Sequence, residues 1–418
     1  MLLSQPTTAL ASRTAVHYRP RLVPKNQVQL SNLVRCLATS TATLKRYDAV
    51  VIGAGPGGLT CVTNLLDQGL QNVCMVDPSF TAGRINEKYR EVPSNTKTMM
   101  FEKWATGTKV AEQILKSAPK PNAYERLLTF NQDAGCPLGD AIDVAQLLSD
   151  GLRKDPRVHS IETRVKSINK LDDNTWRIPE LDLLTNRVVL AVGSHPKPHD
   201  LASHYPHIKP LDLDTCLKPS DLAKAVPEGS KVGVVGASHS AILAIKNLYD
   251  LGNVEVINFH RSPLLYAIYK EGWILYDNTG LKGIAADWAR EVLGALTPPK
   301  TLRRINMKSE ENQGKSEKEI YDKELQGVTH LVSAIGYEMN QLPTITVNGK
   351  TVQPEFDPLT GRFFSAKENK EVLGGLFGAG IAYPERVTDP AGNVESAVGW
   401  FKFMKFVKRT SPEWVQKP

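Results

Sequence analysis

The sequence has few cysteines and no C-x-x-C pair. Five are spread over 418 residues, and they are Cys36, Cys61, Cys74, Cys136 and Cys216. Paired cysteines at short spacing are typical of zinc sites and of redox-active disulfides. We therefore expect neither a metal site nor a disulfide relay. Cys61 falls in a helical pattern and Cys74 in a strand pattern, which favours buried apolar roles in a reducing compartment.

Long hydrophobic runs are also absent. A membrane-spanning helix needs roughly 18 or more consecutive apolar residues without charge, and no stretch of this chain comes near that length. The sequence therefore predicts no transmembrane segment.

Acidic residues are missing from the first part of the chain. No Asp or Glu precedes Asp48, whereas basic residues recur there and supply much of the formal net charge of +7. They are Arg13, Arg19, Arg21, Lys25, Arg35, Lys45 and Arg46. This composition is typical of a mitochondrial presequence, which we predict at residues 1–45. A merely solvated tail on a cytoplasmic protein is the alternative, and a plastid address is left open.

Basic residues elsewhere alternate with acids and form no stripe. Nucleic acid is therefore not an expected partner.

The remaining length favours two domains, and one supersecondary pattern occurs twice. An apolar strand at 48–52, a glycine turn, a helix at 59–69 and a strand at 73–76 form the first unit. A second unit runs from 231 to 259. Alternating residues at 165–168 and 175–178 predict a small antiparallel hairpin. The expected fold class is α/β, with two Rossmann-like dinucleotide-binding domains.

The first glycine turn has the chemistry of a pyrophosphate site. Its glycines permit a tight turn, close approach of the phosphates and close packing of the helix on the strand. Asp77 lies 24 residues after Gly53, near the spacing at which a carboxylate accepts ribose hydroxyls. The alternative is a turn without a ligand. The predicted contacts are Gly53, Ala54, Gly55, Pro56, Gly57, Gly58 and Asp77.

The second turn is a looser match, with small residues in place of two glycines. At the corresponding ribose position stand His260 and Arg261 instead of an acid. A basic pair suits a 2′-phosphate, so NADPH is favoured over NADH, which stays possible. A surface salt bridge is the alternative for this pair. The predicted contacts are Gly236, Ala237, Ser238, His239, Ser240, His260 and Arg261.

Two further glycine strand ends, at 190–194 and 331–337, complete a resemblance. From residue 46 to about 407 the chain resembles the two-dinucleotide-binding flavoproteins, which include the pyridine nucleotide-disulfide reductases and flavin-dependent monooxygenases. The resemblance implies an FAD-binding domain at 46–215 and 330–418, with a nested NAD(P)H-binding domain at 216–329. It also implies FAD or nicotinamide contacts at Arg84, Val165, Ala191, Gly193, Gly336, Gly380, Asn393 and Val394.

The chain departs from this family pattern near its end. Ile381 stands where the reductases usually carry an Asp after the last glycine. From Thr388 we expect a helix that runs to about Lys405, with Asp389 as its cap and its N-terminus aimed at the flavin.

The resemblance implies hydride transfer from NADPH to FAD, a step that needs no side-chain acid or base, and no catalytic residue is predicted. Reduced flavin then serves either a monooxygenase acting on a small molecule or a dehydrogenase that passes electrons to a quinone or other acceptor. The segment 333–337 resembles the N-hydroxylating monooxygenases and narrowly favours the first, although the F-x-G-x-x-x-H signature is missing. A flavin-binding sensor or assembly protein without turnover is the third hypothesis.

One further segment has two interpretations. Tyr276, Asp277 and Asn278 either line a substrate pocket or form a turn before a helix that begins near Ile284. Oligomeric state is left open, a homo-oligomer included.

Overall fold

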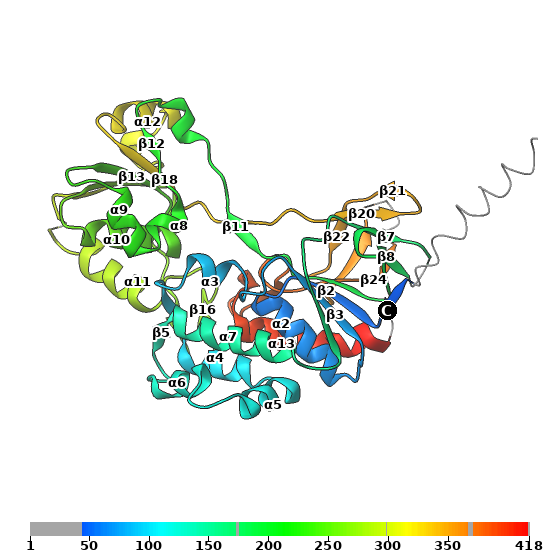
Figure 1. Ribbon diagram of the computed structural model, residues 1–418. Coiled ribbons are helices and arrows are strands. Elements are labelled where there is room, and N and C mark those ends of the chain that lie inside the picture. Colours follow the sequence, from blue (N-terminus) through cyan, green and yellow to red (C-terminus); the bar gives the residue numbers. More distant parts are fainter. Residues whose placement is uncertain (1–43, 173–174, 298, 367–370, 417–418) are drawn as a thin grey trace, which may run out of the picture. The chain divides into compact units, whose positions relative to one another are not determined.

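A seven-stranded sheet forms the centre of the part of the fold that carries the first glycine turn (Figure 1). The computed structural model describes residues 44–172, 175–297, 299–366 and 371–416. The predicted targeting segment therefore lies outside the described residues, apart from residues 44 and 45. In spatial order the strands are β22 (Pro354–Phe356), β23 (Arg362–Ser365), β24 (Val372–Gly378), β10 (Val188–Leu190), β2 (Ala49–Ile52), β3 (Val73–Asp77) and β6 (Val158–Glu162).

From β24 to β6 all neighbours in this sheet are parallel. Parallel strands are buried on both faces and need continuous apolar runs, which is why every residue of β2 and β3 is buried. The C-terminal helix α13 (Trp400–Gln416) packs beside α2 (Pro56–Asp67). Because parallel strands end at one edge, the glycine turns after β2, β10 and β24 meet there.

A five-stranded parallel sheet forms the nested part. Its strands are, in order, β12 (Lys209–Pro210), β18 (His330–Ser333), β13 (Lys231–Val235), β14 (Glu255–His260) and β17 (Leu302–Asn306). The elements of this sheet thus extend beyond the predicted range 216–329 at both ends. The chain enters and leaves this part through β11 (Ser194–Pro196) and β19 (Tyr337–Met339), which pair antiparallel.

A third sheet of six strands contains the predicted hairpin. Its order is β1 (Lys45–Tyr47), β9 (Leu183–Thr185), β8 (Trp176–Ile178), β7 (Ser167–Lys170), β20 (Thr344–Val347) and β21 (Lys350–Thr351). Because β7 and β8 pair antiparallel, the hairpin prediction is confirmed. Three further strand pairs are β4 (Pro93–Lys97) with β5 (Gly135–Pro137), β15 (Ile268–Tyr269) with β16 (Ile274–Leu275), and β25 (Glu385–Thr388) with β26 (Val394–Ala397).

The remaining helices surround these sheets. They are α3 (Arg84–Lys88), α4 (Thr98–Ala105), α5 (Lys109–Ser117), α6 (Ala123–Thr129), α7 (Leu138–Leu152), α8 (Leu213–Cys216), α9 (Pro219–Ala225), α10 (His239–Asp250), α11 (Gly283–Trp288) and α12 (Glu317–Glu324). No helix among them, nor elsewhere in the described ranges, is long and apolar enough to cross a bilayer. All described cysteines are buried and free.

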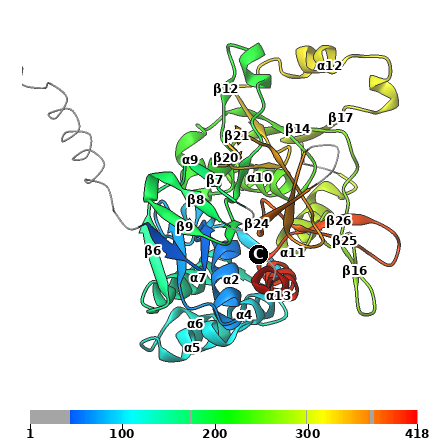
Figure 2. The ribbon, with the colours of Figure 1, turned by 90° about the vertical axis from the view of Figure 1, so that its right-hand side faces the viewer.

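The predicted helix from Thr388 to Lys405 is wrong. Figure 2 shows β25 and β26 as a separate two-stranded ribbon ahead of α13. The carboxylate of Asp389 accepts bonds from the backbone N–H groups of Ala391 and Asn393, at 2.9 and 2.8 Å. Asp389 therefore fixes the tip of a hairpin and not the start of a helix. The helix begins at Trp400 and continues past Lys405 to Gln416.

Candidate functional site

The first glycine turn is fixed by backbone contacts from distant parts of the chain. Gly53 has a positive φ of 109°, and a Cβ on it would lie 2.3 Å from the carbonyl oxygen of Ala191. A Cβ on Gly57 would lie 2.9 Å from the Cα of Gly380. Larger residues therefore do not fit at either position, and the turns after β2, β10 and β24 form one glycine-lined surface.

The helix that follows this turn leaves its N-terminus open. Gly55 is the N-cap of α2, no side chain caps the helix, and its first turn carries no acid. Free N–H groups and the positive end of the helix dipole favour an anion at this point. The site thus fits a pyrophosphate, as the sequence predicts.

Asp77 supports the same turn. One carboxylate oxygen accepts from Ala54 N at 2.7 Å, and the other accepts from Ser79 N and Phe80 N, both at 2.9 Å. A carboxylate offers about four acceptor positions, so these bonds leave room for a ribose hydroxyl. Asp77 also lines the cavity described next.

One cavity of about 1550 Å³ connects both glycine turns. Pockets for one small ligand typically measure roughly 300–1,000 Å³, so this space suits more than one. Its lining includes most of the predicted residues, namely Gly53, Gly55, Pro56, Gly57, Asp77, Arg84, Val165, Ala191, Gly193, Ser238, His239, Ser240, Gly336 and Gly380. None of the cysteines in the described ranges belongs to the lining.

Other predicted residues lie away from this cavity. Ala54 and Gly58 are buried behind the first turn, while Gly236, Ala237, His260 and Arg261 belong to the second unit outside the lining. Asn393 and Val394 sit at the tip of the β25–β26 hairpin, where Val394 is 58% exposed. The start of the last helix, segment 398–400, does line the cavity.

The second turn repeats the construction of the first. Gly236 has a φ of 137°, and a Cβ there would lie 2.3 Å from the carbonyl oxygen of Ala334. Ser238 is the N-cap of α10, again without a side-chain cap or an acid in the first turn. The N-terminus of this helix therefore favours an anion in the same way.

His239 begins α10 with its Nδ1 buried and without a hydrogen-bond partner among the described residues. Burial, with a smaller effect of the Lys282 charge, lowers the pKa of His239 to about 4. The imidazole is therefore neutral at physiological pH, and we assign it no role as a base.

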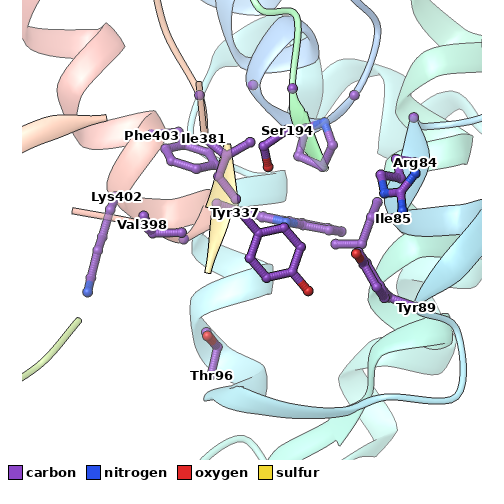
Figure 3. A pocket seen from close by; sticks show the side chains of 18 of the residues that line it. Arg84, Ile85, Tyr89, Thr96, Ser194, Tyr337, Ile381, Val398, Lys402 and Phe403 are labelled. Carbon is purple, nitrogen blue, oxygen red and sulfur yellow. The ribbon is translucent and has the colours of Figure 1, made fainter. Parts of the chain in front are cut away.

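Arg84 connects the side of the cavity near the first glycine turn to the nested part. Its guanidinium pairs with Asp214 of α8, and the Tyr89 hydroxyl donates to the other Asp214 oxygen at 3.0 Å. Tyr89 in turn faces Tyr337, with ring centroids 6.5 Å apart. Figure 3 shows Arg84 and Tyr89 on one side of the cavity, Val398 and Lys402 on the other, and Tyr337 between them.

A charged cluster lies on the side of the cavity opposite Arg84. The sequence predicted only part of it. Asp277 pairs with Lys282 and with Lys402, the latter at 2.6 Å. Lys402 also donates to the Asn278 side chain at 2.5 Å. Buried Glu395 accepts from Asn278 N at 3.1 Å and from the Thr279 hydroxyl. This Asp277 cluster lines the cavity.

Segment 276–278 lies at the cavity and precedes a helix. Asp277 and Asn278 line the cavity, Tyr276 does not, and α11 begins further along, at Gly283. Lys402 was missed because it lay inside a helix that was predicted to begin too early. Glu395 was missed because the hairpin that presents it was read as that helix.

Protein comparisons agree with this geometry. Residues 47–348 match the family model described as pyridine nucleotide-disulphide oxidoreductase. The chain belongs to this family. It is an FAD-dependent oxidoreductase, although its described cysteines are all free and lie outside the cavity.

Within this family the chain is similar to monooxygenases. The monooxygenase AgnR1 of Paecilomyces divaricatus is 42% identical over 385 residues, which cover 88% of this chain and 97% of that protein. A flavin-containing monooxygenase from Stenotrophomonas maltophilia has a TM-score of 0.51 at 14% identity, over 89% of this chain and 98% of that one. Cyclohexanone monooxygenase gives a TM-score of 0.51 at 15% identity, over 89% and 86%. The two structures show the fold. The similarity to AgnR1 shows that this flavoprotein is monooxygenase-like.

Proposed function

We propose that this flavoprotein is an NADPH-dependent monooxygenase that inserts one oxygen atom of O₂ into a small molecule. The balanced reaction consumes substrate, O₂, NADPH and a proton, and yields oxygenated substrate, NADP⁺ and water. The observation that carries the proposal is one cavity of about 1550 Å³ that residues of both glycine turns line and none of the described cysteines reaches. Within the described part of the chain, electrons that enter there meet no disulfide.

The first turn would hold the FAD pyrophosphate at the N-terminus of α2. Gly55, Gly57 and Gly380 leave the backbone bare where the phosphates approach, and Asp77 keeps the turn in shape. Bound FAD supplies the chemistry, because it accepts hydride from a nicotinamide and, once reduced, reacts with O₂. The N-terminus of α13, at Trp400, would favour negative charge on the flavin.

The chain's own residues would position the reactants and exclude water. The second turn would hold the nicotinamide cofactor at α10, whose first turn is free of acids. The Asp277 cluster ties segment 277–279 to the last hairpin and helix, and so closes one side of the cavity. These contacts would keep the two cofactor-binding turns in a fixed relation, and hydride transfer between bound cofactors would then need no side-chain acid or base.

The fate of oxygen tests this proposal. The purified yellow protein is supplied with NADPH, ¹⁸O₂ and a panel of small amines, sulfides, ketones and phenols. We expect one ¹⁸O atom in a product and NADPH consumption that rises with the accepted substrate. Electron transfer to a quinone with no labelled product would favour the dehydrogenase hypothesis, and no NADPH consumption with any acceptor would favour a sensor.

We also propose a mitochondrial address for residues 1–45, on the strength of their basic, acid-free composition. The test is a fusion of this segment to a fluorescent protein in a fungal cell. Import into mitochondria is expected, and diffuse cytoplasmic fluorescence would contradict it.

A further inference from the structure

Arg304 lies beside the second glycine turn on a strand that sequence reasoning left without a role. In the parallel pairing of β14 with β17, Arg304 stands opposite Asn258, and Asn306 stands opposite His260. Both strands end at the edge where the turn begins. Arg304 is therefore placed near the position at which a nucleotide ribose meets a fold of this kind.

A buried asparagine fixes Arg304 to the turn. Asn258 is 0% exposed, and its side-chain amide donates to the carbonyl oxygens of Gly236 and Val234, at 2.7 and 3.1 Å. Its side-chain oxygen accepts from Arg304 Nε at 3.1 Å. A strand interior normally carries an apolar residue at such a position, so this polar link positions the guanidinium relative to Gly236.

The rest of the Arg304 guanidinium has no partner among the described residues. Nη2 is buried and makes no hydrogen bond, and within the described ranges the only hydrogen bond of the group is that of Nε with Asn258. Burial lowers the pKa of Arg304. Burial together with the Arg304 charge also lowers the pKa of His260. This corner therefore carries positive charge that no carboxylate of the described residues balances.

Neighbouring arginines are neutralised, which sets Arg304 apart. Arg261 pairs with Glu317 at 2.7 Å, and its side chain is 59% exposed. This is the surface salt bridge that the sequence analysis gave as the alternative. Arg303 pairs with Glu324 at 2.6 Å. An unpaired, partly buried guanidinium is costly unless an anion joins it, and the geometry of its fork suits a phosphate.

We propose that Arg304, with His260 beside it, binds the 2′-phosphate of NADPH at the carboxyl end of β14. This assignment deepens the proposed function, because it rests on NADPH as the electron donor. It makes Arg304, held by Asn258, the main determinant of NADPH over NADH, and it leaves Arg261 a lesser part. A free ribose hydroxyl would not balance the guanidinium charge, so NADH would bind more weakly.

Binding of adenosine 2′,5′-bisphosphate and of AMP to the FAD-loaded protein tests the assignment. The two probes differ only in the 2′-phosphate. We expect Arg304→Met to weaken the bisphosphate by about 10- to 100-fold, the range of a lost charge-assisted contact, and to leave AMP unchanged. Arg303→Met is the matched control and should change neither. Arg261→Met should cost the bisphosphate only a few-fold.

The outcomes separate this inference from the function on which it rests. A wild-type protein that binds both probes equally would overturn NADPH use and the Arg304 assignment together. A wild-type preference that survives Arg304→Met, or that disappears in Arg261→Met instead, would overturn the assignment alone. If Arg304→Met loses FAD, Arg304→Lys keeps the charge without the fork, and it should retain only part of the preference. If Arg304→Lys keeps the full preference for the bisphosphate over AMP, the planar guanidinium geometry has no role in binding.

Discussion

Gly57 and Gly380 touch backbone to backbone, although more than three hundred residues separate them in the sequence. A Cβ on Gly57 would lie 2.9 Å from the Cα of Gly380, closer than real Cβ atoms come to backbone. This contact joins the first turn of the fold to the last glycine strand end. The proposed pyrophosphate site is thus completed only when the C-terminal part of the chain has packed.

A substitution at Gly55 should weaken FAD binding without lowering the stability of the protein. Its φ of −73° is open to any residue, and a Cβ would meet only ordinary contacts, at 3.7 Å from Ala82 O. We therefore expect Gly55→Ala to leave the unfolding midpoint of the FAD-free protein unchanged. It should weaken FAD by about tenfold or more, because the methyl group would meet the phosphates. Fluorescence titration of the apoprotein with FAD measures this.

Gly53→Ala is the companion variant. Its Cβ would lie 2.3 Å from Ala191 O at a φ of 109°, so it should lower the stability of the apoprotein itself. Wild-type FAD affinity in Gly55→Ala would refute the placement of the pyrophosphate.

His239 predicts a specific dependence of stability on pH. Its folded-state pKa is about 4 because of burial and the Lys282 charge, below the ordinary value near 6.5. Between these values the unfolded chain takes up a proton that the folded chain refuses, so stability falls as pH falls. From pH 7 to pH 5 the loss is about 2 kcal/mol.

His239→Asn should remove this part of the pH dependence. Urea unfolding at the two pH values, for both proteins, gives the comparison. Equal losses of unfolding free energy in wild type and variant would contradict a neutral, buried His239.

The Asp277 cluster should stabilise the fold through charge balance. Burial acts to raise the pKa of Asp277, but the hydrogen bonds from Lys282 and Lys402 outweigh it and leave the pKa low. The ionised Asp277 therefore adds to the free energy of unfolding above the ordinary Asp pKa. This contribution is lost as the pH falls through the lower pKa of the folded state. At neutral pH, Asp277→Asn removes the carboxylate that Lys282 and Lys402 share, leaves one positive charge in excess, and should cost about 1–3 kcal/mol.

Two lysine variants check this reading by urea unfolding. Lys402→Met combined with Asp277→Asn should cost less than the sum of the two single changes, because the pair is coupled. Lys405→Met, one turn further along α13 and exposed, is the control and should be nearly neutral. Strict additivity of the Asp277 and Lys402 changes would show that the contact contributes nothing.

The link from Asp214 to Arg84 and Tyr89 predicts an effect on rate. Asp214→Asn removes the charge that pairs with Arg84 and weakens a connection between the two halves of the cavity. We expect FAD to stay bound and anaerobic flavin reduction by NADPH to slow by about tenfold or more, since hydride transfer depends on ring alignment. Stopped-flow absorbance measures it. The exposed neighbour Asp212 supplies the control, Asp212→Asn, and equal rates in both variants would exclude the predicted role.

Local rules predicted the two strand, turn and helix units well, because buried parallel strands and glycine turns leave strong signals in sequence. The same rules failed after Val387. Asp389, Pro390 and Gly392 are turn residues, yet they were read as the start of a helix because family resemblance placed a helix nearby. Asn393 and Val394 were misplaced for that reason.

Long-range contacts account for most of what was missed at the site. Nothing near Lys402 in the sequence indicates that Asp277 pairs with it, and nothing near Arg84 indicates Asp214. The role of Asn258 depends on register between β13, β14 and β17, which a single sequence does not specify. Arg304 differs from Arg261 and Arg303 in having no carboxylate partner among the described residues, and these pairings depend on the fold.

If FAD and NADPH meet in one cavity, NADPH should reduce the bound flavin in the absence of oxygen. The purified protein, with its bound flavin oxidised, is mixed under argon with NADPH or with NADH, and the flavin absorbance near 450 nm is followed. Bleaching by about one equivalent of NADPH is expected, faster or at lower concentration than with NADH. A flavin that keeps its colour with both nucleotides would contradict it.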